Sequence, residues 1–234
     1  MPLISVITPF SRGIKELSQL IRDFRNQVFT DFEHIIVRDG IVPEDIKQFM
    51  KEHEKDYNIK FTSVDKDTGN MSISPGTKPR NQGLFMSQGK YVVFADDDDR
   101  YCYTYLSYLI DEMKGDMITA VQMACPETRT VQKGNPNRVA IIPELGLSFF
   151  PVICHVGTPC CLIPRKWAIA DPWRHEPQHD YRFFKRIVDK YKPPVLIKPG
   201  IQVDVGGLLL LDEKDWTHQI EIKEIEEEKC PQSQ

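Results

Sequence analysis

Residues 89–100 read GKYVVFADDDDR, a very apolar run that leads directly into four consecutive aspartates. An unbroken apolar run of this kind is typical of a strand buried on both faces, as in a parallel sheet. Four adjacent carboxylates at the end of such a strand repel one another unless positive charge lies among them. A divalent cation meets that need, because Mg²⁺ and Mn²⁺ bind carboxylate, phosphate and water oxygens. The alternative is a solvated acidic turn that caps the next helix.

Strand-like and helix-like segments alternate along the chain before this stretch. Apolar runs predict strands, and apolar residues at helical spacing predict the helices that follow them. The expected strands are 3–8, 34–37, 59–64 and 91–95, and the expected helices are 14–24, 46–50 and 79–87. Pro9 is expected to end the first strand, and Pro43 to start the second helix.

This alternation predicts an α/β fold with a mostly parallel central sheet and helices on both faces. In open sheets of this kind, ligands bind beyond the carboxyl ends of the strands. Polar loops follow three of the expected strands, at 9–13, 38–40 and 96–100. The sequence therefore places a ligand site where these three loops converge.

The second half of the chain is less regular. Residues 116–123 and 195–205 are expected to form strands, and residues 126–146 a long loop or short hairpin. A helix is expected to begin near His179 and Asp180, because Phe184, Ile187 and Tyr191 recur at helical spacing. No internal repeat interrupts this order.

Composition excludes several classes of protein. The chain has 234 residues, 41% of them hydrophobic and 27% charged, which is typical of a soluble globular domain. Its 30 Lys and Arg against 34 Asp and Glu give a net charge of -4, too mild to indicate a nucleic-acid partner. Its 6 cysteines include no pair at the spacing of a zinc site, and no run has membrane-spanning length. The expected location is therefore the reducing cytoplasm.

Four motifs, in this order, resemble family 2 glycosyltransferases. They are ISVITPF at 4–10, HIIVRDG at 34–40, PRNQG at 79–83 and GKYVVFADDDD at 89–99, with weaker similarity over 158–165 and 179–187. The resemblance implies a GT-A fold and transfer of a sugar from a nucleotide-diphosphate donor to an acceptor hydroxyl, with inversion. It also implies UDP as the nucleotide and Mn²⁺ or Mg²⁺ as the cofactor. The acceptor is expected to be a glycan, a lipid-linked group or a protein.

The same resemblance implies one GT-A domain over 1–234. Within it, residues 1–100 form the nucleotide-binding half, 101–205 the acceptor-binding half and 206–234 a C-terminal tail.

Three residues are expected at the nucleobase. The resemblance places Pro9 and Phe10 in the loop that cradles the base and Asp39 where the family binds it through an acceptor. Phe10 could instead pack in the core, and Asp39 could simply form a turn beside Gly40. This chain carries Arg38 where many members have a second acidic residue, which leaves the identity of the base open.

The diphosphate and the metal are expected beside the aspartates. Arg80 combines a helix N-terminus with a guanidinium suited to phosphate, and Arg12 is a second candidate, although Arg80 could also be a surface residue. Alignment to the family's Asp-x-Asp motif places Asp96 and Asp97 near the donor and Asp98 on the metal, with the register open by one residue.

The expected catalytic base is Asp180, at the start of the downstream helix. It would take the proton of the acceptor hydroxyl, and a position at a helix N-terminus keeps it ionised. It could instead be an N-cap, with Glu176 as the reserve base. Trp167, Trp173 and His179 are expected to contact the acceptor, although tryptophan is more often a core residue.

Two other functions fit parts of this pattern. A sugar-1-phosphate nucleotidyltransferase shares the sheet and the acidic metal site, but the 9–13 loop has a single glycine where such enzymes have a glycine-rich phosphate loop. A non-catalytic sugar-nucleotide or glycan-binding domain could have kept the fold and lost turnover.

Overall fold

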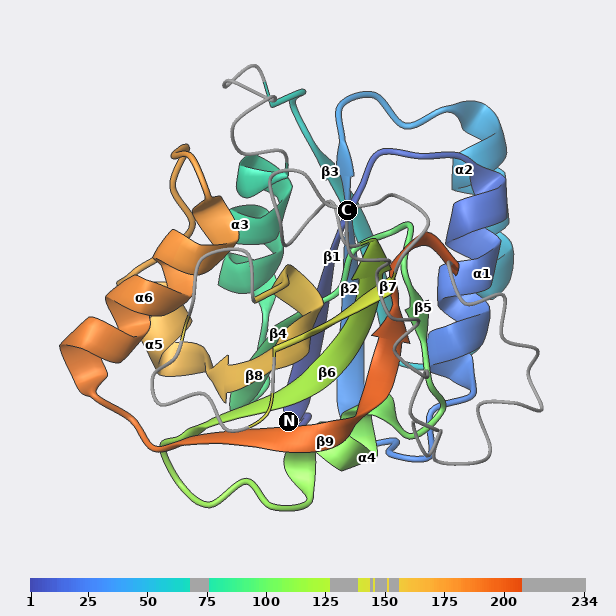
Figure 1. Cartoon of the computed structure of the whole chain (residues 1–234). Helices are drawn as coiled ribbons and strands as arrows, with labels where there is room; N and C mark the ends of the chain where they lie inside the picture. Colours follow the sequence, from blue (N-terminus) through green and yellow to red (C-terminus); the bar gives the residue numbers. More distant parts are fainter. Residues whose placement is uncertain (68–75, 127–138, 144, 146–150, 152–155, 208–234) are drawn as a thin grey trace, which may run out of the picture.

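A mixed sheet runs through the molecule and organises the fold (Figure 1). The computed structural model describes residues 1–67, 76–126, 139–143, 145, 151 and 156–207. Within them, nine strands form one sheet in the order β3-β2-β1-β4-β8-β6-β9-β5, with β7 paired to β6.

The elements alternate as the sequence predicts over the first hundred residues and become irregular after that. In chain order they are β1 (Ile4–Phe10), α1 (Ile14–Arg25), β2 (Phe32–Asp39), α2 (Glu44–His53), β3 (Ile59–Val64), α3 (Thr77–Met86), β4 (Tyr91–Phe94), β5 (Arg100–Tyr101), α4 (Tyr105–Ile110), β6 (Ile118–Pro126), β7 (Val139–Ile142), η2 (Thr158–Cys160), β8 (Cys161–Pro164), α5 (Arg165–Ala170), α6 (His179–Tyr191), β9 (Val195–Asp204) and η3 (Val205–Gly207).

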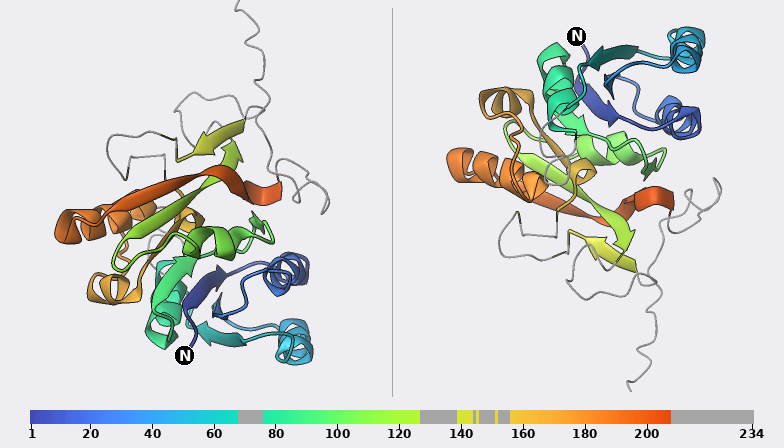
Figure 2. Two further views of the ribbon diagram at one scale, coloured as in Figure 1. Left: turned by 90° about the horizontal axis from the view of Figure 1, so that it is seen from below. Right: turned by 90° about the horizontal axis from the view of Figure 1, so that it is seen from above.

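The first half of the sheet is parallel, as predicted. Strands β3, β2, β1 and β4 lie side by side in that order, all in parallel pairs. Helices α1 and α2 cover one face, and α3, α5 and α6 lie on the other side (Figure 2). The carboxyl ends of these strands therefore share one edge, which is the condition for a common site.

The first strand continues through Pro9, contrary to the expectation that it ends there. The carbonyls of Leu3 and Ile7 accept hydrogen bonds from the backbone N–H groups of Tyr91 and Ala95, at the start of β4 and just after its end. The backbone groups of the odd-numbered residues in this strand therefore point toward β4. Pairing with β4 stops at Ile7 and Phe94. Pro9 therefore lacks its N–H at a position with no neighbouring strand on that side, where proline is tolerated.

The second half of the sheet is mixed. Strand β8 is antiparallel to both β4 and β6, and β6 runs parallel to β9. The expected hairpin is present in part, because β7 pairs antiparallel with β6, while residues 127–138 lie outside the described part. The expected C-terminal tail also lies outside it from residue 208 onward. The division into two functional halves stays a prediction.

Helix α3 approaches β1 unusually closely. A Cβ on Gly83 would lie 2.5 Å from Cγ2 of Ile7 and 3.3 Å from Cγ2 of Val37, so only glycine fits. The helix begins after Gly76, which has a φ of 77°, a left-handed conformation that suits glycine. This close packing fixes the position of α3, and therefore of Arg80 in its first turn, relative to the carboxyl end of β1.

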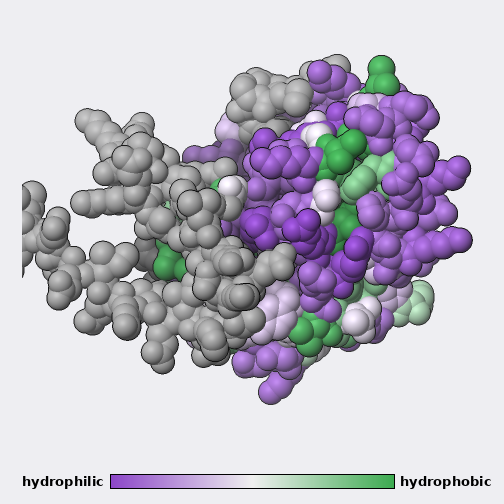
Figure 3. Space-filling view, turned by 90° about the vertical axis from the view of Figure 1, so that its right-hand side faces the viewer, coloured by the Kyte–Doolittle hydropathy of each residue, from purple (hydrophilic) through white to green (hydrophobic). Residues whose placement is uncertain are grey.

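The outer face over α1 and α2 is mostly hydrophilic, with apolar residues only in small groups (Figure 3). In α1, the apolar residues turn inward, and Leu17, Leu20, Ile21 and Phe24 are buried. No helix in the described ranges is long and apolar enough to cross a membrane.

Candidate active site

A cavity of about 310 Å³ opens at the carboxyl ends of β1, β2 and β4. The start of α3, the η2 turn and the start of α6 complete its wall. All the expected site residues except the two tryptophans line it. The full lining is Pro9, Phe10, Ser11, Arg12, Asp39, Gly76, Pro79, Arg80, Asp96, Asp97, Asp98, Thr158, His179 and Asp180.

Asp96, the first of the four aspartates, is paired with Arg80. Nη2 of Arg80 donates to Oδ1 of Asp96 at 2.7 Å. The Arg80 side chain is only 5% exposed, and its guanidinium lies 5.0 Å over the ring of Trp173. Burial raises the pKa of the Asp96 carboxyl, Arg80 opposes that rise, and Asp180 and Asp98 add to it. Arg80 is therefore a fixed positive charge beneath the site.

Asp97 and Asp98 differ in their partners. Oδ2 of Asp97 accepts the backbone N–H groups of Ser11 and Arg12, at 2.8 Å and 3.2 Å. Burial raises the pKa of Asp97 and the Ser11 N–H opposes the rise. Asp98 has a side chain that is 32% exposed, and Nη2 of Arg12 donates to its Oδ2 at 2.5 Å. Asp97 thus anchors the first loop, and Asp98 faces the cavity.

Asp99 turns away from this cavity. It is 4% exposed and accepts the backbone N–H of Gly206 at 3.3 Å. The next residues are held by Asp23 of α1, which accepts from Nε of Arg100 at 3.0 Å and from the backbone N–H of Tyr101 at 3.0 Å. The end of the aspartate cluster is therefore tied to α1 and to the segment after β9.

Asp180 lies in the first turn of α6 and lines the same cavity as Asp98. Oγ1 of Thr158 donates to Oδ1 of Asp180 at 2.6 Å, and Nε2 of His179 lies 3.0 Å from the same oxygen. Burial acts to raise the pKa of Asp180, but His179, Arg80 and the Thr158 hydroxyl outweigh it, so the pKa is lowered. The site keeps this carboxylate ionised, as a general base requires.

Asp39, at the end of β2, also lines the cavity, and its Oδ1 accepts the backbone N–H of Asp67 at 2.7 Å. Its second carboxylate oxygen accepts nothing from the described residues. Phe10 is fully buried, and the guanidinium of Arg38 lies 4.9 Å over its ring. Phe10 therefore packs in the core and at the same time borders the cavity.

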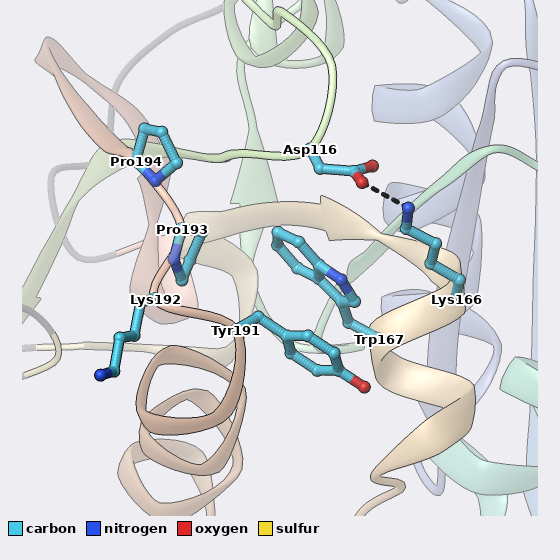
Figure 4. Close-up of a pocket in the computed structure, with 7 residues that line it drawn as sticks. All are labelled: Asp116, Lys166, Trp167, Tyr191, Lys192, Pro193 and Pro194. Atoms are coloured by element: carbon cyan, nitrogen blue, oxygen red, sulfur yellow. Dashed lines mark hydrogen bonds and ion pairs between the residues drawn. The ribbon is translucent and has the colours of Figure 1, made fainter.

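The two tryptophans lie elsewhere. Trp173 is 2% exposed and stacks on Phe183 at 4.1 Å, so it supports Arg80 from below. Trp167 stacks on Tyr191 at 5.0 Å and borders a separate cavity of about 570 Å³ (Figure 4). That cavity opens near the starts of β6 and β9, at the end of the sheet that lies away from the aspartates. Neither ring lines the aspartate cavity, and their contact with an acceptor stays a prediction.

Sequence reasoning missed Thr158 and Ser11. Thr158 comes from the η2 turn, more than twenty residues before the helix that it contacts, so no local spacing links it to Asp180. Ser11 acts through its backbone N–H, which any residue but proline supplies. Ser11 could have been suggested by its position between Phe10 and Arg12, and Thr158 only by its place at the start of the weakly similar segment 158–165.

A divalent cation fits the chemistry of this site in one particular way. No group of three or more histidine, cysteine, aspartate or glutamate side chains in the described residues is arranged to hold a metal. Asp98 nevertheless presents a partly exposed carboxylate to the cavity. Mg²⁺-type ions are commonly held by one or two carboxylates together with substrate phosphates and water. The residues therefore suit a metal that arrives with a phosphate ligand.

The sequence profile of the family described as Glycosyl transferase family 2 matches residues 5–170. Among curated proteins, GalNAc(5)-diNAcBac-PP-undecaprenol beta-1,3-glucosyltransferase of Campylobacter jejuni is 35% identical over 115 residues. That alignment covers 48% of this chain and 35% of the relative. For the similar curated proteins, the aligned part ranges from 15% to 37% of their own length.

Two solved structures share the fold. Residues 1–349 of Staphylococcus aureus TarS in complex with UDP superpose with a TM-score of 0.64 at 19% identity, covering 88% of this chain and 60% of that chain. The mannosyltransferase PcManGT from Pyrobaculum calidifontis, in complex with GDP-Man and Mn²⁺, gives 0.60 at 12% identity, covering 88% and 57%.

Proposed function

This chain belongs to glycosyl transferase family 2. From that premise we propose that it transfers the sugar of a UDP-sugar to an acceptor hydroxyl, with inversion at the anomeric carbon and with Mn²⁺ or Mg²⁺ as the cofactor. One observation carries the proposal. A single cavity is lined by the partly exposed Asp98, by Arg12 and Arg80, and by Asp180, whose lowered pKa keeps it ionised. Family membership favours glycosyl transfer over nucleotidyl transfer, because the former is the reaction that gives the family its name.

The donor would lie along the first loop. Asp39 offers a carboxylate oxygen that can accept the imide N–H of uracil, and Pro9 and Phe10 border the same end of the cavity. Arg80 sits in the first turn of α3, where a helix N-terminus and a guanidinium both favour the diphosphate. Arg12 lines the same cavity and contacts Asp97 and Asp98. The TarS complex with UDP is consistent with this choice of base.

Asp98 is the residue we assign to the metal. Three contacts support this choice: Asp97 accepts two backbone N–H groups, Asp96 is paired with Arg80, and Asp99 accepts the backbone N–H of Gly206 outside this cavity. When bound, a divalent cation would act as a Lewis acid that neutralises charge on the departing diphosphate. Asp98 and the phosphate oxygens would hold it.

Asp180 is the proposed base. The acceptor oxygen forms a bond to the anomeric carbon while the bond from that carbon to the diphosphate oxygen breaks, and UDP leaves with the bonding electrons. The hydroxyl proton passes to Asp180. The Thr158 hydroxyl and His179 hold Oδ1 in place, which leaves Oδ2 to receive the proton.

The test is release of UDP from UDP-sugars, measured with manganese and with EDTA. We expect EDTA to abolish turnover and Asp98→Asn to lower it by about 10²-fold or more, the usual effect of removing one electrostatic stabiliser. Asp116→Asn, which alters a surface ion pair with Lys166, is the matched control and should behave as the wild type. If UDP release is unchanged both by EDTA and by Asp98→Asn, Asp98 does not bind a catalytic metal. Binding of UDP without any turnover would favour a non-catalytic domain.

A further inference from the structure

We propose that Arg12 is an exchangeable counter-ion for Asp98. In this inference, which rests on the proposed function, the Arg12 guanidinium neutralises Asp98 until the metal binds, and then moves to the donor diphosphate. Metal and nucleotide would therefore bind cooperatively, because the nucleotide gives Arg12 a new partner and so frees Asp98 for the metal.

The contact that must be exchanged is a direct one. Nη2 of Arg12 lies 2.5 Å from Oδ2 of Asp98, and Nε of Arg12 lies 3.5 Å from Oδ1 of Asp97. Arg12 is the one cation that pairs with Asp98 within the described ranges. A divalent cation brought to the Asp98 carboxylate would lie close to this guanidinium, and like charges at such separations repel strongly. Ligation by Asp98 therefore favours departure of the Arg12 side chain.

The backbone of Arg12 is fixed, and its side chain has room to move. The backbone N–H donates to Asp97 at 3.2 Å, and the carbonyl accepts Nη1 of Arg38 at 2.6 Å. The side chain, in contrast, is 49% exposed. The guanidinium can thus change partners by side-chain rotation alone, without disturbing the loop that borders the base.

Arg12 also lies where two cavities meet. It borders the cavity of about 310 Å³ that would hold the donor and a second one of about 580 Å³, lined by α1, the aspartates and η3. Arginine suits a diphosphate because its planar fork donates two parallel hydrogen bonds to phosphate oxygens. Arg80 does not share this freedom, because its side chain is 5% exposed and held against Asp96 and Trp173.

The experiment measures manganese binding directly, by the loss of the free Mn²⁺ signal in electron paramagnetic resonance, with and without UDP. We expect Arg12→Gln to bind Mn²⁺ alone about tenfold more tightly than the wild type, a coupling of ordinary size. We also expect UDP to strengthen manganese binding less in this variant than in the wild type. The matched control is Lys15→Gln, which removes the same charge from the start of α1 and should change binding by less than about twofold.

Two further variants separate the outcomes. Arg12→Lys keeps the charge and should bind Mn²⁺ alone nearly as weakly as the wild type. If binding depends on Asp98 but Arg12→Gln binds manganese no better than the wild type, the counter-ion inference is overturned and the proposed function stands. If manganese binding, with or without UDP, is insensitive to Asp98→Asn, the metal assignment fails and this inference fails with it.

Discussion

The four aspartates show how identical side chains acquire different roles from their neighbours. Asp97 anchors the first loop, Asp99 anchors the segment after β9, and Asp96 is matched by a buried arginine. Only Asp98 combines partial exposure with a cationic partner that is itself half exposed. The surroundings of each carboxylate therefore decide its role. Hydrogen bonds and burial change the pKa of the carboxylate, and burial also decides whether a ligand can reach it.

Asp180 gives a residue-scale prediction about pH. The pKa of Asp180 is lowered, so this carboxylate stays ionised through the range in which an ordinary aspartate takes up a proton. It is lost as a base only as pH falls through the lowered pKa. We therefore expect no acid limb of kcat/KM from Asp180 above about pH 4. Asp180→Asn should lower kcat by about 10²- to 10⁴-fold with UDP affinity nearly kept.

Thr158→Val is the companion to that variant. It keeps the shape of the side chain and removes the hydroxyl that donates to Asp180. A rate loss smaller than that of Asp180→Asn, together with an acid limb that moves upward, is expected because a lost hydrogen bond to a carboxylate raises its pKa. Wild-type turnover in Asp180→Asn would remove this residue as the base.

Among the elements, α3 connects the packing of the sheet to the site, because its first turn carries Arg80 and Gly83 packs against β1. Gly83→Ala would place a methyl group 2.5 Å from Cγ2 of Ile7, which is branched and fully buried. The helix would have to move outward and carry Arg80 with it. Overpacking of this kind costs about 1–3 kcal/mol, against a gain of about 1 kcal/mol in helix propensity.

The overpacking cost less the propensity gain leaves a net loss, so we expect Gly83→Ala to lower the free energy of unfolding by about 1 kcal/mol. We also expect it to weaken UDP binding, because Arg80 moves with the helix. Urea denaturation and calorimetric titration with UDP would measure the two effects. Phe85→Ala, on the exposed side of the same helix, is the control and should stay within about 0.5 kcal/mol of the wild type. An unchanged free energy of unfolding in Gly83→Ala would contradict this prediction, because it would mean that Ile7 can move aside without cost.

At the scale of the whole molecule, α1 joins the two halves of the chain. Asp23 holds Arg100 and the backbone of Tyr101, and Gln27 bonds the carbonyl of Cys102 at 2.6 Å and the N–H of Leu106 at 3.0 Å. The short strand β5 then pairs with β9 from the C-terminal half. The aspartate cluster is thus clamped between segments that are far apart in sequence.

Removing this clamp should affect the whole fold. Asp23→Ala would leave the Tyr101 N–H without its carboxylate partner, and we expect a loss of about 1–3 kcal/mol in the free energy of unfolding. Chemical denaturation measures it, and Asp116→Ala, which breaks only the exposed pair with Lys166, should cost under about 1 kcal/mol. Equal effects of the two substitutions would contradict the clamp.

The parallel half of the sheet follows from the sequence alone, and so does the meeting of the three polar loops at one cavity, although Ser11, Gly76, Pro79 and Thr158 in its lining were not expected. Strands such as β4 are unbroken apolar runs. Parallel pairing brings the carboxyl ends of these strands, with Asp39 and the aspartates, to the same end of the sheet, whatever the side-chain contacts are. The downstream helix and its Asp180 were also predicted, because its apolar spacing is regular.

Other features depend on contacts between segments that are distant in the chain. Strand β5 has only 2 residues, too few for a periodic signal, and the pairing of β5 and β8 depends on partners distant in the chain. The tryptophans are placed by packing between α5 and α6 and the core, which spacing does not reveal. Likewise, Asp97 and Asp98 have the same local sequence and became distinct only when Ser11 and Arg12 reached them across 86 residues, because hydrogen bonds and ion pairs are set by distance in space.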